Sequence, residues 1–219
     1  MEKVMLYEGK AKRVYRTEEE GVCLVEFKDD ATAFDGAKRG TIAGKGRFNA
    51  EISARLFQVL DQAGISNHFI RLISPREMLV KRVSIIPVEV VVRNRVAGSM
   101  ARRLGLEEGR HLNPPVVEYY LKSDDLHDPM INEDHIVSLN LASREEISTL
   151  RETALRVNTA LRDFLAERGI ELVDFKLEFG RYGKQLIVAD EISPDTCRFW
   201  DLSTRDKLDK DRFRHDLGR

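Results

Sequence analysis

The stretch ELVDFKLEFG (171–180) alternates between polar and apolar residues, and it decides the fold class of the chain. Consecutive side chains of a β-strand point to opposite faces of the sheet. The predicted polar face carries Asp174, Lys176 and Glu178, and the predicted apolar face carries Val173, Phe175, Leu177 and Phe179. A second strand is predicted over Gln185–Asp190, after a turn around Gly180–Gly183. Two strands joined by a short turn are typical of an antiparallel sheet.

A long amphipathic helix is predicted before this pair of strands. Ser143 and Glu146 have the spacing of a capping box, in which each side chain bonds to the backbone of the other residue. Apolar residues then recur at helical spacing as far as Leu165, and Gly169 ends the helix. Other predicted helices cover Phe48–Gln62 and Ser99–Leu104, and a polar helix is expected from Asp206 onward.

The N-terminal part of the chain is predicted to consist mainly of strands. Apolar runs rich in β-branched residues indicate strands over Val4–Tyr7, Arg13–Arg16, Val22–Phe27, Phe69–Ile73, Met78–Val83 and Val88–Val92. The sequence therefore predicts an α+β protein of two lobes. A small, antiparallel, β-rich N-terminal lobe is expected over residues 1–85, and a larger α+β lobe over residues 86–219.

Composition and charge exclude several classes of function. Hydrophobic residues make up 42% and charged residues 33% of the 219 residues, as in soluble globular proteins, and no apolar run approaches the ~20 residues of a membrane span. The N-terminal residues contain no apolar signal core, and two cysteines, Cys23 and Cys197, suit a reduced compartment. The expected location is the cytoplasm. The net charge of −1 predicts neither a membrane nor a nucleic-acid partner.

Charge is nevertheless distributed unevenly along the chain. Two basic runs without acidic residues extend over residues 38–47 and 93–103, and two later stretches, 124–128 and 190–201, are rich in aspartate. Each run alone is typical of a solvated surface. Together, and beside glycines, the runs suit a site for a polyanion and a metal ion.

Three lysines are candidates for binding phosphate groups. Lys10 and Lys12 flank Ala11 after Gly9, where a glycine lets the backbone approach a phosphate and lysines neutralise it. The spacing of a P-loop is absent, and an ordinary charged hairpin explains the same residues. Lys81 lies in a predicted strand, like the lysine that contacts the α- and β-phosphates in kinases. An exposed lysine on an edge strand is the plainer alternative.

Two further features of the sequence suit the binding of phosphate or carboxylate groups and of a metal ion. Arg93 and Arg95 precede Ser99 at a predicted helix start, and paired guanidinium N–H groups bind phosphate or carboxylate. Asp174, Glu178 and Asp190 come from two neighbouring predicted strands, and proteins hold Mg²⁺ with one or two carboxylates plus phosphate oxygens and water. These carboxylates are candidates for a magnesium site, and a polar face turned to the solvent explains the same alternation.

Six motifs together resemble the SAICAR synthetase family, the phosphoribosylaminoimidazole-succinocarboxamide synthases. The motifs are YEGKAKRVY (7–15), FKDDATAFDGAKRGTIAGKGRFNAEIS (27–53), IPVEVVVRNRVAGS (86–99), DDLHDP (124–129), VDFKLEFG (173–180) and DEISPDTCRFWD (190–201). They follow the family's order over nearly the whole chain, and as a set they are highly specific. Members of this family usually continue with a helical stretch beyond DRFRHDLG. The resemblance implies that this stretch contributes to stability and to contacts between subunits more than to the reaction.

The resemblance implies a kinase-like N-terminal lobe, with ATP in the cleft between the lobes. The residues that it assigns to the nucleotide are Lys10, Ala11, Lys12, Lys81 and Ile85, and those that it assigns to magnesium are Glu178 and Asp190. Those assigned to the imidazole nucleotide are Arg93, Ser99, Lys176 and Arg198, and the expected catalytic residues are Lys176, Arg198 and Asp35. The convergence of Arg93 and Arg198 predicts a shared anion between them, because two unpaired guanidiniums would repel each other.

The reaction that the resemblance implies is an amide synthesis. L-aspartate is joined to the carboxylate of 5-amino-1-(5-phosphoribosyl)imidazole-4-carboxylate (carboxyaminoimidazole ribonucleotide) by an ATP-dependent carbon–nitrogen ligase of de novo purine biosynthesis. ATP is a substrate, Mg²⁺ is the cofactor, and the reaction passes through an acyl phosphate. The expected partners are these small molecules, with a homodimer as one expectation for assembly.

Two alternatives stay open on the local residues alone. A small-molecule kinase would handle the nucleotide in the same way but would leave the phosphoryl group on the acceptor. A nucleic-acid-binding module would use the two basic runs. The pI of about 6.5 and the scarcity of aromatic residues in those runs weigh against the second alternative.

Overall fold

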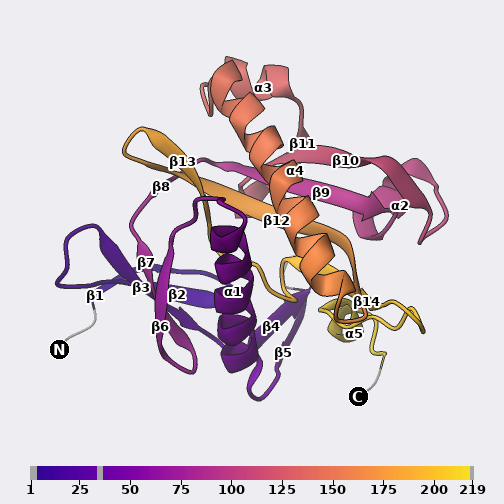
Figure 1. The fold of residues 1–219 in the computed structure, drawn as a ribbon, viewed down its shortest axis with the longest axis horizontal. Coiled ribbons are helices and arrows are strands. Elements are labelled where there is room, and N and C mark those ends of the chain that lie inside the picture. Colours follow the sequence, from indigo (N-terminus) through magenta and orange to yellow (C-terminus); the bar gives the residue numbers. More distant parts are fainter. Residues whose placement is uncertain (1–3, 34–36, 218–219) are drawn as a thin grey trace.

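The computed structural model describes residues 4–33 and 37–217, and it confirms the predicted α+β class. Figure 1 shows the sheets with the two long helices, α1 and α4, lying against them. The first sheet has five antiparallel strands in the order β1-β2-β3-β7-β6. Its strands are β1 (Val4–Glu8), β2 (Lys12–Arg16), β3 (Val22–Phe27), β6 (Phe69–Ser74) and β7 (Glu77–Lys81). These bounds agree closely with the strands predicted for the N-terminal part.

The second sheet is built around β12 (Ile170–Tyr182), the strand that the alternating stretch predicts. It has seven strands in the order β11-β10-β9-β12-β13, and β8 and β14 also pair with β12. The other strands are β8 (Ser84–Ile85), β9 (Val88–Arg95), β10 (His111–Leu121), β11 (Met130–Ile131), β13 (Gln185–Ala189) and β14 (Cys197–Asp201). The first half of β12 pairs with β9 and β14, and its second half pairs with β8 and β13. One long strand therefore gathers four segments that are distant in sequence.

Helix α4 (Arg144–Ala166) packs against this sheet, and helix α1 (Lys45–Gln62) packs against α4 and against β3, β6 and β7 of the first sheet. Both helices contribute to one apolar core. The capping box predicted for α4 is present, because Ser143 Oγ accepts a bond from the Glu146 amide and the Glu146 carboxylate accepts one from the Ser143 amide. Figure 1 shows α4 crossing β9 and β12. The buried face of α4 shares one apolar core with Phe175 and Leu177 of β12.

One residue departs from the predicted alternation of β12. The pairing with β14 shifts register between Leu172 and Asp174. Val173 consequently packs with Ala97 and Trp200 in a small separate cluster instead of the main core. An extra residue at such an irregularity turns the local side chains away from strict alternation.

The shorter elements complete the chain. They are α2 (Gly98–Leu104), α3 (Glu133–Ser138), α5 (Asp211–Arg214), the two-stranded sheet of β4 (Asp30–Ala33) and β5 (Lys38–Thr41), and a 3₁₀ turn over Asp124–Leu126. The helix predicted from Asp206 onward is wrong at its start, because Lys207 pairs with Trp200 in a β-bridge and α5 begins only at Asp211. Tertiary pairing overrides the helical tendency of this polar segment.

Among the residues that the structure describes, no helix has the length and apolar character needed to cross a membrane. The predicted boundary at residue 85 falls on the last residue of β8, which pairs with β12 of the second sheet. The division of the chain at this residue stays a prediction.

Candidate active site

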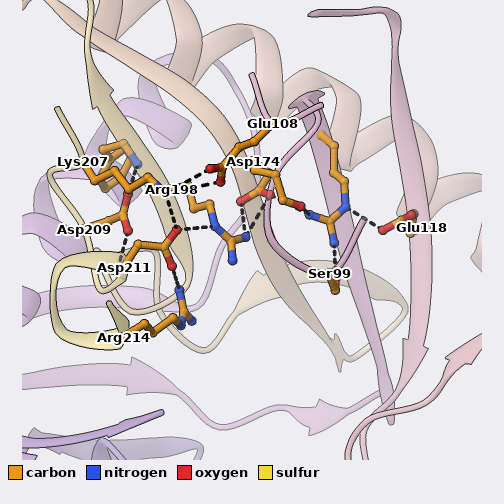
Figure 2. Close-up of polar contacts among 12 residues, drawn as sticks. Ser99, Glu108, Glu118, Asp174, Arg198, Lys207, Asp209, Asp211 and Arg214 are labelled. Atoms are coloured by element: carbon orange, nitrogen blue, oxygen red, sulfur yellow. Dashed lines mark hydrogen bonds and ion pairs between the residues drawn. The ribbon is translucent and has the colours of Figure 1, made fainter. Parts of the chain in front are cut away.

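An arginine cluster surrounds Asp174 in the middle of the second sheet. On β12, Asp174 is paired with Arg93 of β9 on one side and with Arg198 of β14 on the other. Arg93 Nη1 donates to Asp174 Oδ2 at 2.6 Å. Arg198 Nη1 donates to both oxygens of Asp174, at 3.0 and 3.1 Å, as Figure 2 shows. The two arginines do converge, and the anion between them in this structure is a carboxylate of the chain itself.

Arg93 is held on every side by protein groups. Its Nε donates to Glu118 Oε2 at 2.6 Å, and its Nη2 donates to Ser99 Oγ at 3.1 Å. Arg93, Glu118 and Asp174 are each 3% exposed. A buried guanidinium between two carboxylates has its charge compensated internally. Arg198 has 17% of its side chain exposed, so it is the arginine of the pair that reaches the solvent side more fully.

A second cluster alternates lysines with carboxylates where β12 and β13 meet the turn between β1 and β2. Lys12 donates to Asp190 at 2.5 Å. Glu178 accepts a bond from Lys122 at 2.6 Å and one from Lys176 at 3.4 Å. The pairing of β12 with β13 places Glu178 opposite the residue before Asp190. The structure therefore brings together both carboxylates that the family resemblance assigns to magnesium.

The charges in this cluster determine its protonation states. Burial alone would lower the pKa of Lys12 and of Lys176, but the surrounding carboxylates outweigh burial and hold the pKa of each lysine above its usual value. Burial alone would raise the pKa of Asp190, but the charges of the two lysines outweigh it and lower that pKa. At neutral pH both lysines are cationic and Asp190 is anionic.

A cleft of 310 Å³ lies against the arginine cluster, and Arg93, Asp174 and Arg198 line it. From the cluster of lysines and carboxylates, Lys176 reaches this cleft together with its partner Glu89. Lys10 and Asp128 also line the cleft, and Lys10 donates to Asp124 at 2.7 Å. The acidic loop that carries Asp124 and Asp128 therefore reaches the same cleft as the lysines of the β1–β2 turn.

The remaining residues that the resemblance assigns to the nucleotide lie near the cluster of lysines and carboxylates. Lys81 Nζ donates to the carbonyl of Asn67 at 3.0 Å, and the neighbouring His68 Nε2 lies 3.0 Å from the carbonyl of Asp190. Ile85 pairs with Gly180 of β12, and Ala11 accepts a backbone bond from Lys28. Asp35 lies outside the described residues.

The glycine-rich start of α1 already holds an anion from the chain. Asp29 accepts bonds from the amide of Gly46 at 2.8 Å and from that of Gly44 at 3.3 Å. Lys45, between these glycines, pairs with Asp195. Free amides at a helix N-terminus can bind an anion. In the structure, the amides of Gly44 and Gly46 donate to the carboxylate of Asp29.

Several residues of the two clusters are missed by the sequence analysis. They are Glu89, which pairs with Lys176, Glu118, which pairs with Arg93, Lys122, which pairs with Glu178, and Asp211, which pairs with Arg198. Glu118 and Lys122 lie on or just after β10, whose strand pattern is interrupted by Pro114 and Pro115. The run of β-branched and aromatic residues in VVEYYL (116–121) is the signal that points to this strand.

The donor set suits Mg²⁺. Carboxylate oxygens are its preferred protein ligands, and it usually takes only one or two of them when a nucleotide supplies the rest. Glu178 and Asp190 provide two such carboxylates beside cationic lysines. Within residues 4–33 and 37–217, no group of three or more histidine, cysteine, aspartate or glutamate side chains is arranged to hold a metal.

Cationic side chains from both clusters reach one cleft of this α+β protein, which is typical of a site for anionic small molecules. Known proteins identify the family. A family model described as SAICAR synthetase matches residues 5–219. Relatives named phosphoribosylaminoimidazole-succinocarboxamide synthase include one from Coprothermobacter proteolyticus, 58% identical, with 100% of this chain and 93% of the relative covered, and one from Persephonella marina, 59% identical, with 97% and 90% covered. This chain belongs to the SAICAR synthetase family.

Solved structures agree with this assignment. The synthase from Ehrlichia chaffeensis superposes with a TM-score of 0.96 at 44% identity, covering 98% of this chain and 92% of that one. A SAICAR synthetase in complex with ADP superposes with a TM-score of 0.94 at 51% identity, covering 97% and 91%. The chain is therefore an enzyme, an ATP-dependent ligase of purine biosynthesis.

Proposed function

We propose that this enzyme joins L-aspartate to the carboxylate of 5-amino-1-(5-phosphoribosyl)imidazole-4-carboxylate, with ATP and Mg²⁺, through an acyl phosphate. The products are the succinocarboxamide, ADP and phosphate. The observation that carries the proposal is that two different charge clusters reach one cleft, the arginines around Asp174 directly and the lysines with carboxylates through Lys176. The relatives' shared name and the ADP bound to a similar structure support it.

The chemistry explains why one cleft needs both clusters. A carboxylate is a poor acylating agent, because its oxygen is a poor leaving group. An oxygen of the imidazole carboxylate attacks the γ-phosphorus of ATP, and ADP leaves. The aspartate amine then attacks the acyl carbon, the carbon–oxygen bond to phosphate breaks, and the amine loses its proton. Phosphate carries away one oxygen of the original carboxylate.

Bringing a triphosphate, a sugar phosphate and several carboxylates together creates strong repulsion. Lys12 and Lys176 are cationic at neutral pH and stand beside the proposed phosphate path, so they offset part of that repulsion. Positioning and electrostatics supply most of the catalysis in phosphoryl transfer. Glu178 and Asp190 would hold Mg²⁺, which neutralises phosphate charge when bound. We assign Lys10, Ala11, Lys81 and Ile85 to the nucleotide, and Ser99, Arg93 and Arg198 to the imidazole nucleotide.

Isotope labels test the reaction directly. With aspartate labelled at its amine nitrogen, mass spectrometry is expected to find the label in the amide of the product. With heavy oxygen in the imidazole carboxylate, one labelled oxygen is expected in the released phosphate. A stable phosphorylated imidazole nucleotide as the end product would instead indicate a kinase. The cytoplasmic location and the homodimer stay predictions.

Replacing Arg198 by lysine is expected to weaken binding of the imidazole nucleotide selectively. Arginine offers several N–H donors in one plane, and lysine can maintain neither the contact with Asp174 nor that with Asp211 in the same geometry. The loss of a charge-assisted hydrogen bond of ~1.5–3 kcal/mol predicts a KM for this substrate that is at least tenfold higher. Saturation curves for both substrates measure the effect, with Arg205→Lys as control. An equal loss for ATP would indicate a general defect.

Replacing Lys81 by methionine tests its assignment to the nucleotide. Methionine keeps the apolar stem and removes the charge. We expect ATP binding to weaken by ~1–3 kcal/mol, the range for a hydrogen bond to a charged group. Calorimetric titration with ATP measures this, and Lys184→Met, at the exposed turn between β12 and β13, is the control. An unchanged affinity for ATP would show that Lys81 does not bind the nucleotide and that its hydrogen bond to the Asn67 carbonyl is structural.

A further inference from the structure

The guanidinium of Arg198 is fixed at two of its nitrogens by carboxylates from different parts of the chain. Asp174 of β12 accepts from Nη1, and Asp211 of α5 accepts from Nε at 2.9 Å. Figure 2 shows the guanidinium between these two carboxylates, with its second terminal nitrogen pointing away from both. Arg198 lines both the cleft described above and a neighbouring cavity of 680 Å³ that Ser99 also lines. The orientation of the guanidinium is therefore set before any ligand arrives.

Asp211 is itself held rigidly. Its side chain is 2% exposed, and its Oδ1 accepts from Arg214 at 2.5 Å. The carboxylate of Asp209 accepts from the Asp211 amide at 2.7 Å and from the Phe199 amide at 2.9 Å. Because Phe199 follows Arg198 in β14, Asp209 ties α5 to the strand that carries the arginine. Burial alone would raise the pKa of Asp211, but Arg198 and Arg214 outweigh burial and lower it, so Asp211 is charged at neutral pH.

Gly98 makes room for this arrangement from the opposite side. A Cβ added at Gly98 would lie 2.7 Å from Arg198 Cζ and closer still to Nη2. A flexible side chain normally moves aside from such a contact, but this guanidinium can move only by giving up its bonds to Asp174 or Asp211. The backbone at Gly98 also has a φ of 54°, which side chains other than glycine disfavour. Gly98 and Asp211 therefore constrain the same group.

We infer that Asp211 is a positioning residue for Arg198, and that Gly98 completes the position by leaving space for Nη2. The inference rests on the proposed function, in which Arg198 binds an anionic group of the imidazole nucleotide. Asp174 accepts from Nη1 of the guanidinium and Asp211 accepts from Nε, so Nη2 is the nitrogen that can donate to the ligand. A guanidinium that is already oriented loses less conformational entropy when it binds.

The test compares Asp211→Asn with Glu171→Gln. Glu171 also bridges two arginines, Arg95 at 2.7 Å and Arg205, but it lines none of the cavities described above. In Asp211→Asn, one uncharged oxygen remains to accept from the two arginines, so Nε of Arg198 loses either its acceptor or the charge of that acceptor. We expect the calorimetric Kd and the KM for the imidazole nucleotide to rise about tenfold, a change of about 1.4 kcal/mol. The KM for ATP stays unchanged, and Glu171→Gln changes neither constant.

Gly98→Ala is a second test of the position of the Arg198 guanidinium, and it leaves Asp211 unchanged. Its control is Gly105→Ala at the other end of α2, where φ is 62° and no atom lies within 4 Å of the added Cβ. Both variants carry the same kind of backbone strain, but only Gly98→Ala meets the guanidinium. Gly98→Ala is expected to raise the Kd for the imidazole nucleotide, and Gly105→Ala is expected to leave it unchanged.

The outcomes separate this inference from the proposed function. If the parent enzyme does not bind the imidazole nucleotide in the calorimeter, the proposed function fails. If the parent binds it, and Asp211→Asn binds it equally well, the positioning role is overturned. If Asp211→Asn does not fold, Gly98→Ala decides the matter, and the same affinity in Gly98→Ala and Gly105→Ala contradicts the inference.

Discussion

Replacing Asp190 by asparagine is expected to reduce kcat by at least ~10²–10³-fold, the range for losing one preorganised electrostatic contact in a reaction centre. The carboxylate pairs with Lys12 at 2.5 Å, and we propose that it also holds the metal ion. Asparagine keeps the shape and loses the charge. It also tolerates the positive φ of 64° at this residue better than most side chains. The fold is therefore expected to survive the change.

Steady-state rates over a series of magnesium concentrations measure this effect. Asp216→Asn is the matched control, because Asp216 also has a positive φ, of 52°, and pairs with Lys38 at 2.7 Å on the exposed C-terminal segment. The control is expected to keep normal turnover and the normal magnesium dependence. Near-normal activity of Asp190→Asn at limiting magnesium would remove Asp190 from the metal site.

Replacing Asp174 by asparagine is expected to lower the free energy of unfolding by about 3–5 kcal/mol, as when one partner of a buried ion pair is removed. Asp174 is buried between Arg93 and Arg198 and accepts bonds from both. An asparagine can accept from one arginine, but its amide nitrogen then faces the donors of the other. Two guanidiniums would share the space without an anion between them.

Urea denaturation measures this loss, with an unchanged m-value as the sign that the cooperative transition persists. The control is Asp163→Asn on the exposed side of α4, for which a change within about 0.5 kcal/mol is expected. A loss of less than about 1 kcal/mol in Asp174→Asn would show that Arg93 and Arg198 do not depend on this carboxylate.

Local patterns in the sequence predict most of the elements. Alternation over residues 171–180 predicts β12, the capping box at Ser143 and Glu146 predicts the start of α4, and Gly105 predicts the end of α2. These signals depend on a few neighbouring residues and on steric rules that act locally. The strand β10 is missed because Pro114 and Pro115 break the run that would otherwise indicate it.

The order of strands around β12 cannot be derived from local patterns. Nothing near Asp174 in the sequence shows that β9 and β14 flank it, although this pairing brings Arg93 and Arg198 together. From the sequence alone, the anion shared by Arg93 and Arg198 is expected to belong to a ligand. In the structure, this anion is the carboxylate of Asp174. For the same reason Lys122 and Asp211 are not found, since each meets its partner only through the fold.

We expect this enzyme to couple ADP formation to amide synthesis. A coupled ADP assay with ATP, the imidazole nucleotide and aspartate, each omitted in turn, tests it most directly. We expect sustained ADP release only when all three are present. Without aspartate, each active site can form one acyl phosphate and then stops. Sustained ADP release in the absence of aspartate would contradict the account and would indicate a kinase or an ATPase instead.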